Sequence, residues 1–326
     1  MIRPMRGFGP RAWLVTGCLL WVAAVCAVHA SAPPEAAARV VEENSGSAGN
    51  SAQEPAPTYV GDDTCLICHD DKRRPYISTP HGRSADARTP AARQGCETCH
   101  GPASRHVEDP GSVLPPVAFT KAPPREVNAV CTTCHNRGEH ALWEGSQHES
   151  RGLACTNCHS VHAFKSATRQ LDKAKQIELC ADCHREKVSK VDRSGHMPVR
   201  EGKLDCTTCH NPHGSTNVRL LRTGDSIADQ CTSCHAEKRG PFLWEHAPTR
   251  DGCVTCHDPH GSSNERMLVT RPPILCQRCH VATRHPSTIY DAGLIGTSAR
   301  VFARSCVTCH AAIHGSNHPS GQRFTR

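Results

Sequence analysis

The sequence predicts a mostly irregular fold with short α-helices, almost no β-strand and no conventional apolar core. Leu, Ile, Val and Phe make up only 53 of the 326 residues, about 16 %, a fraction typical of disordered chains. A Cys-x-x-Cys-His pattern nevertheless recurs ten times, with Pro- and Gly-rich segments between the copies. Burial of so few apolar side chains cannot offset the conformational entropy that the chain loses on folding. Folding therefore requires an additional apolar group bound by the repeated motifs.

The ten Cys-x-x-Cys-His motifs use twenty of the twenty-two cysteines. The other two, Cys18 and Cys26, lie in an N-terminal apolar run. The motif cysteines are Cys65, Cys68, Cys96, Cys99, Cys131, Cys134, Cys155, Cys158, Cys180, Cys183, Cys206, Cys209, Cys231, Cys234, Cys253, Cys256, Cys276, Cys279, Cys306 and Cys309. The motif histidines are His69, His100, His135, His159, His184, His210, His235, His257, His280 and His310.

Covalent haem c is the chemistry that requires this pattern. Zinc accepts two cysteines at this spacing but does not need a histidine directly after the second one. The same objection applies to a thioredoxin-type dithiol, and a disulfide scaffold would not repeat one local spacing ten times. In haem c, two thiols bond the vinyl groups and the adjacent imidazole is the proximal iron ligand. We therefore expect ten haem c groups, stacked in a row that forms the core of an elongated multihaem cytochrome c.

Haem c attachment outside the cytoplasm requires export, and residues 1–30 have the form of a signal peptide. Three arginines precede the apolar run of residues 12–28, and small residues follow, which predicts cleavage before Ser31. The apolar run falls short of the roughly 20 residues that usually span a bilayer, which disfavours an uncleaved anchor. A loose lipoprotein-like box ends at Cys18, but the apolar run continues past it.

The rest of the chain divides into a tail and a haem-binding domain. Residues 31–58 are rich in Pro, Ala, Ser and Gly and contain no motif, which is typical of a disordered tail. Residues 59–326 form the predicted decahaem domain, which could consist of two pentahaem halves with a boundary near residues 195–205. Residues 167–187 are its strongest helix candidate.

The motifs alternate in kind, which predicts an array of two-motif units. The copies at Cys155, Cys206 and Cys253 continue as Cys-x-x-Cys-His-x-x-His, whereas the copies between them lack the close second histidine. Two motifs then make one unit of roughly fifty residues, as in stacked repeat proteins. A Leu-Trp-Glu sequence recurs at Trp143 and Trp244, and we expect both indoles to pack on porphyrin edges.

The charge balance does not indicate a nucleic-acid partner. Lys and Arg exceed Asp and Glu by seven, and removal of residues 1–30 leaves a surplus of four. Each haem adds two propionates, so the basic side chains are expected to pair with these rather than with phosphates.

The sixth ligand of each iron separates an electron carrier from an enzyme, because an open position can bind a substrate. Twelve histidines lie outside the motifs and the signal peptide, which is enough to close ten irons. Methionine could serve at most two, since only Met197 and Met267 remain after cleavage. His140 and His318 rank as spares, and the pairing of histidine with iron cannot be read from the sequence. The distal candidates are His81, His106, His148, His162, His196, His213, His246, His260, His285 and His314.

With its ten motifs, its Cys-x-x-Cys-His-x-x-His units and its ending AAIHGSNHPSGQRF, the chain resembles the Mtr-type periplasmic decahaem cytochromes, which include DmsE-like members. The resemblance covers residues 59–326. It implies a row of bis-histidine haems inside an outer-membrane β-barrel partner, carrying electrons in either direction between periplasm and cell exterior for extracellular metal reduction or iron oxidation. It also implies periplasmic or inner-membrane redox proteins as partners, and an outer-surface multihaem cytochrome.

Two alternatives remain open at this point. A multihaem reductase of a small nitrogen or sulfur oxyanion would need an open haem, often with Lys in place of the motif histidine, but all ten motifs keep histidine. A membrane-anchored quinol-oxidising cytochrome would need an uncleaved N-terminal helix. We therefore expect an electron-transfer protein with no catalytic residue.

Overall fold

A computed structural model of the chain describes residues 55–280 and 305–325. Of the two units into which the chain divides, only the second, Pro55–Arg326, contains described residues. The predicted signal peptide, nearly all of the predicted tail and the candidate ligand His285 therefore lie outside the described residues.

Every α-helix of the described residues is short, with at most nine residues. They are α1 (Asp62–Cys65), α2 (Asp70–Ile77), α3 (Glu97–His100), α4 (Ser104–Glu108), α5 (Pro124–Thr132), α6 (Gln176–Ala181), α7 (Arg185–Val191), α8 (Cys206–Cys209), α9 (Ile227–Thr232), α10 (Ala247–Asp251) and α11 (Ile274–Gln277). Single 3₁₀ turns occupy Pro80–Gly82, Pro90–Ala92, Gly138–His140, Glu149–Arg151, Cys155–Asn157, Thr168–Gln170, Val218–Leu220, Ala236–Lys238, Cys253–Thr255, Glu265–Met267, Cys306–Thr308 and Gly321–Arg323.

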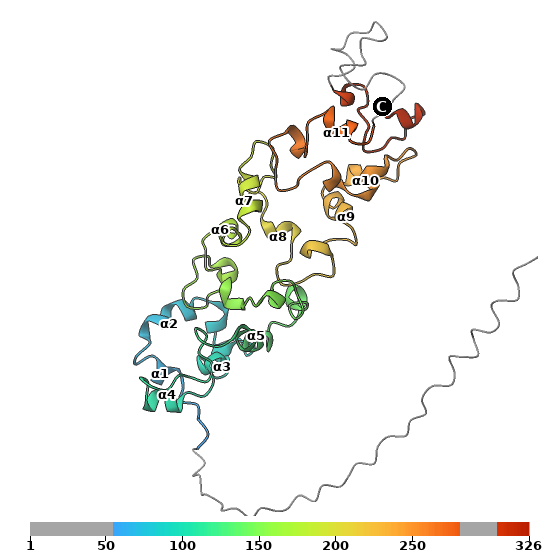
Figure 1. Ribbon diagram of the computed structural model, residues 1–326. Coiled ribbons are helices and arrows are strands. Elements are labelled where there is room, and N and C mark those ends of the chain that lie inside the picture. The colour runs from blue at the N-terminus through green and yellow to red at the C-terminus, as the bar shows by residue number, and fades with distance from the viewer. Residues whose placement is uncertain (1–54, 281–304, 326) are drawn as a thin grey trace, which may run out of the picture. The chain divides into compact units, whose positions relative to one another are not determined.

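Within the described residues, β-structure is limited to isolated bridges such as His210 with Leu221 and His257 with Leu268. In the second unit the helices follow one another in chain order, from α1 at one end to α11 near the other (Figure 1). The prediction of a mostly irregular, elongated chain with short helices is therefore confirmed.

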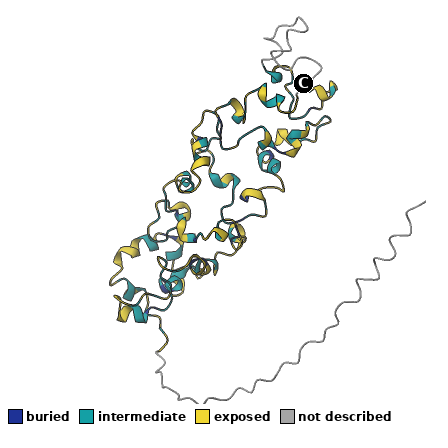
Figure 2. Cartoon of the chain, viewed as in Figure 1, coloured by how far each residue is buried: buried dark blue, intermediate teal, exposed yellow. Residues whose placement is uncertain are grey.

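The described residues bury very little apolar side chain, as Figure 2 shows. Trp143 is the largest of the buried apolar residues, and Val127 is the most completely buried. Ile67 and Leu243 are exposed over 79% and 67% of their surface, although burial of such side chains normally drives folding. The polypeptide alone thus lacks the apolar interior that a domain of this size needs.

The single helix expected over residues 167–187 is not formed. A 3₁₀ turn at Thr168–Gln170, α6 and α7 divide this segment. Arg169 has φ 66°, outside the right-handed helical region, and so ends the first turn. The second break follows the attachment motif, because His184 leaves helical geometry at the N-terminus of α7.

Candidate haem-binding sites

Each of the ten motifs closes one turn of backbone, α-helical in some copies and partly 3₁₀ in others. In every copy the histidine N–H donates to the carbonyl oxygen of the first cysteine, at 2.8 to 3.1 Å. His184 to Cys180 is an example at 2.8 Å, and His100 to Cys96 is one at 3.1 Å. This i to i−4 bond fixes both thiols and the imidazole on one turn of backbone, which is the arrangement that a porphyrin bonded at two vinyl groups and at iron requires.

The motif cysteines bring the ten motifs into one unbroken sequence of neighbours, and none of the twenty forms a disulfide. Side-chain hydrogen bonds join first cysteines in pairs, Cys65 with Cys96, Cys131 with Cys155, Cys180 with Cys206, Cys231 with Cys253 and Cys276 with Cys306. In the remaining steps second cysteines lie within electrostatic range of each other, Cys99 with Cys134, Cys158 with Cys183, Cys209 with Cys234 and Cys256 with Cys279. The attachment points therefore follow one another in chain order, with alternating sides in contact.

Eight motif histidines face a candidate distal histidine across a gap that fits one iron. Metal–imidazole bonds are about 2 Å long, so rings on opposite sides of one metal lie about 6 Å apart, centre to centre. The eight centroid distances run from 5.9 to 6.4 Å. The pairs are His69–His106, His135–His81, His100–His162, His184–His148, His159–His213, His210–His260, His280–His246 and His257–His314.

The other candidates have different surroundings. The His196 ring is hydrogen-bonded to Glu201 at 3.0 Å, which raises the pKa of His196, and it does not face a motif histidine. The spare His140 lies 4.3 Å from the ring of His213 and 5.5 Å from that of His135, tilted to both. His318 accepts a hydrogen bond from the backbone N–H of Ser320.

Burial favours the neutral form of several of the facing histidines, which is the form that binds a metal. It lowers the pKa of His213 to about 4, and it lowers the pKa of His162, His260 and His314. A neutral imidazole offers a free nitrogen lone pair to iron at physiological pH.

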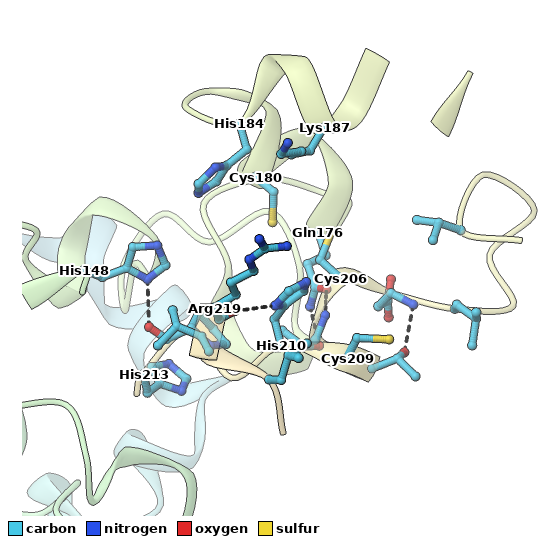
Figure 3. A pocket seen from close by; sticks show the side chains of 18 of the residues that line it. His148, Gln176, Cys180, His184, Lys187, Cys206, Cys209, His210, His213 and Arg219 are labelled. Carbon is cyan, nitrogen blue, oxygen red and sulfur yellow. Dashed lines mark hydrogen bonds between the residues drawn. The ribbon is translucent and has the colours of Figure 1, made fainter. Parts of the chain in front are cut away.

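Backbone carbonyls orient several of these rings through Nδ1, which leaves Nε2 toward the cavity. The motif histidine His210 donates Nδ1–H to the carbonyl of Arg219 at 2.8 Å, and the distal candidate His148 donates to that of Pro212 at 2.8 Å (Figure 3). Such partners fix the tautomer of a metal-bound histidine. Sequence reasoning missed the carbonyl-bearing arginines, although an Arg-x-Leu sequence recurs at residues 169–171, 219–221 and 266–268.

One continuous cavity of about 4880 Å³ runs past all ten motifs. Ordinary ligand pockets measure about 300–1,000 Å³, so this space fits a series of large cofactors rather than one ligand. Among the described residues that line it, the Tyr76 hydroxyl and the Trp143 indole N–H are buried without a hydrogen-bond partner. Such groups normally have partners, so their exposure to this space fits a polar group such as a porphyrin propionate.

Residues 55–280 and 305–325 contain neither a helix that could cross a membrane nor a cluster of side chains that could hold a bare metal ion.

Comparison with known proteins identifies several similar cytochromes. The doubled CXXCH motif family matches residues 196–240 and 246–285, and the cytochrome c-type protein NrfB-like family matches residues 96–183. The multiheme cytochrome MtrA of Shewanella baltica is 41% identical over 276 residues, which cover 82% of this chain and 81% of that protein. The cytochrome c-type protein NrfB of Escherichia coli is 31% identical over 130 residues, which cover 38% of this chain and 65% of that protein.

Proposed function

Because the chain belongs to the family of the multihaem cytochrome MtrA, we propose that it carries electrons through ten covalently attached haems, between the periplasm and the cell exterior. The continuous order of the attachment points is the observation that carries this proposal. Each motif lies near the next through one of its cysteines, so every porphyrin bonded between the two end motifs would have a neighbour on either side. The bound haems supply reversible one-electron redox chemistry, and the chain holds them in sequence.

The eight facing pairs support bis-histidine ligation, and seven of them follow a simple rule; the exception is His106, which follows the second motif and faces His69 of the first. The motifs are numbered one to ten in chain order. A histidine just after an even-numbered motif is the distal partner of the even-numbered motif before that one, as His162, just after the fourth motif, faces His100 of the second. A histidine just before an even-numbered motif is the distal partner of the odd-numbered motif that follows, as His148, before the fourth motif, faces His184 of the fifth. The rule assigns His196 to His235.

Elimination assigns His285 to His310. With these two pairs, all ten irons are closed, and His140 and His318 remain spare. Closed irons have no position for a substrate, so we propose that no haem is catalytic. Bis-histidine ligation also favours lower potentials than histidine–methionine ligation, which suits transfer among similar haems.

The proposed location is the periplasm, with the haem row inserted in an outer-membrane β-barrel protein. Hydrocarbon about 30 Å thick is too wide for a single electron hop, so a row of haems must bridge it. A closed barrel would keep the largely polar polypeptide away from lipid, because it leaves no unpaired backbone edge. Periplasmic or inner-membrane redox proteins would exchange electrons at one end of the row, and an outer-surface multihaem cytochrome at the other.

Two measurements test this function. Mass spectrometry of the mature protein should find Ser31 as the N-terminus and ten haems attached. Purification from outer membranes should yield a β-barrel protein together with the chain. Nine haems or fewer in fully matured protein would show that one motif is unused, and recovery of the chain alone from the soluble periplasm would contradict the barrel assignment.

A further inference from the structure

Three arginines of the Arg-x-Leu repeats have a backbone conformation that rarely suits a side chain. Arg169, Arg219 and Arg266 have φ values of 66°, 57° and 55°. Glycine adopts this left-handed region freely, whereas other residues occupy it in a few per cent of cases. The residues that follow these arginines, Gln170, Leu220 and Met267, share this conformation but differ in type, whereas arginine recurs at all three positions, which indicates that arginine serves a purpose there.

The backbone of each arginine contacts a proximal histidine. Its carbonyl oxygen accepts a hydrogen bond from Nδ1 of the histidine nine or ten residues earlier. An isolated β-bridge, such as His210 with Leu221, closes the loop between the histidine and the arginine. The bonds join His159 to Arg169 at 2.7 Å, His210 to Arg219 at 2.8 Å and His257 to Arg266 at 2.8 Å. A glycine could supply the same carbonyl, so the backbone contact does not explain why the residue is arginine.

The side chains enter the same cavity as the motifs. All three arginines line it, and Figure 3 shows the Arg219 side chain reaching from its backbone toward Cys180 of the preceding motif. Within the described residues none of the three guanidinium groups forms an ion pair with a carboxylate. Arg169 donates only to the Thr207 hydroxyl, at 3.0 Å. Three cations that face a cofactor cavity therefore retain the capacity to bind an anion.

We propose that Arg169, Arg219 and Arg266 are two-sided positioning residues, each of which orients a proximal histidine through its carbonyl and binds a haem propionate through its guanidinium. This inference rests on the proposed function, because it assumes the haems at these motifs. A propionate is a carboxylate, and guanidinium recognises carboxylates through two parallel N–H···O bonds. The left-handed backbone lets one residue reach the imidazole and the cavity at the same time.

The guanidinium should raise the potential of the haem it contacts, because its positive charge favours the added electron. Arg219→Gln removes the charge and keeps a long polar side chain. It should shift the reduction equilibrium of one haem about tenfold toward the oxidised form, which corresponds to about 59 mV for one electron. Arg219→Lys should restore most of the shift, since it keeps the charge. Arg125→Gln is the matched control, because Arg125 is exposed and does not line the cavity.

The carbonyl contact needs a second comparison. Arg219→Gly and Arg219→Val both remove the guanidinium, but only glycine keeps the left-handed backbone without strain. The valine variant should therefore change the low-spin electron paramagnetic resonance signal of one haem relative to the glycine variant, because the His210 ring loses its acceptor.

Spectroelectrochemical titration of the holoprotein decides the matter, with Arg266→Gln as a second variant in case Arg219 variants do not accumulate. No shift in either glutamine variant, an equal shift in Arg125→Gln, or identical spectra for the glycine and valine variants would overturn the proposal. The haem count of each variant is measured alongside. Ten low-spin haems with unshifted potentials would refute the arginine role alone, whereas an unmodified protein with open or missing haems would refute the function on which it rests.

Discussion

His260→Ala should open one iron, and that iron should belong to a motif far from His260 in sequence. His260 follows the motif at Cys253 by only a few residues, but its ring faces that of His210, with centroids 6.2 Å apart and planes inclined by 8°. His257, in the nearer motif, instead faces His314. Loss of the imidazole should leave the iron held by His210 five-coordinate and high-spin.

The expected magnitude follows from the number of haems. One open iron among the ten that the motifs hold is about one tenth of the iron. Double variants identify which one. His260→Ala with His210→Ala removes two ligands from a single haem and should still leave about one tenth of the iron high-spin. His260→Ala with His257→Ala removes ligands from two haems and should give about two tenths.

Quantitative electron paramagnetic resonance of the oxidised holoprotein measures these fractions, with haem content determined on the same samples. The reverse order, two tenths for the first double variant and one tenth for the second, would show that His260 serves its own motif. An unchanged low-spin spectrum for His260→Ala alone would show that it is not a ligand. Either result would refute the pairing rule drawn from the ring geometry.

Three further outcomes are expected. His140→Ala should leave every haem low-spin, because the facing pairs do not use this ring, and a high-spin signal of about one tenth would make it a ligand. Glu97→Ala should destabilise the holoprotein by about 3 kcal/mol in urea unfolding, since its buried carboxylate accepts from the backbone N–H groups of Val60, Gly61 and Ala103; Glu97→Gln should lose less, and equal losses would contradict this account. Chain produced without haem attachment should lack cooperative thermal unfolding, because the apolar interior is missing, and a sharp transition would disprove that explanation.

The scarcity of regular structure was predictable from the sequence alone, because it depends on local features; the attachment sites, which depend on local features too, remain predictions. Two thiols and an imidazole lie on one helical turn wherever Cys-x-x-Cys-His occurs, so Cys180 and His184 need no tertiary information to be assigned. The helix expected over residues 167–187 was wrong because Arg169 adopts a left-handed conformation. Its conformation is set by the contact with His159, which helix propensity does not include.

The pairing of the distal histidines could not be predicted, because it depends on how one two-motif unit packs on the next. His213 lies three residues from His210 in sequence, yet its ring faces His159. Sequence offsets marked His213 and His260 as equivalent, which the structure bears out, but gave no information about the partner. The assignments of His196 and His285 remain predictions of the pairing rule.

Electron transfer across a bilayer tests the central claim most directly. The chain and its co-purified barrel protein would be inserted into lipid vesicles that enclose a soluble redox dye, and a membrane-impermeant reductant would be added outside. The account predicts dye reduction with haem-loaded protein and none with vesicles that contain the barrel alone. A dye that stays oxidised, although the inserted complex carries ten reducible haems, would contradict the proposal that this chain conducts electrons across the membrane.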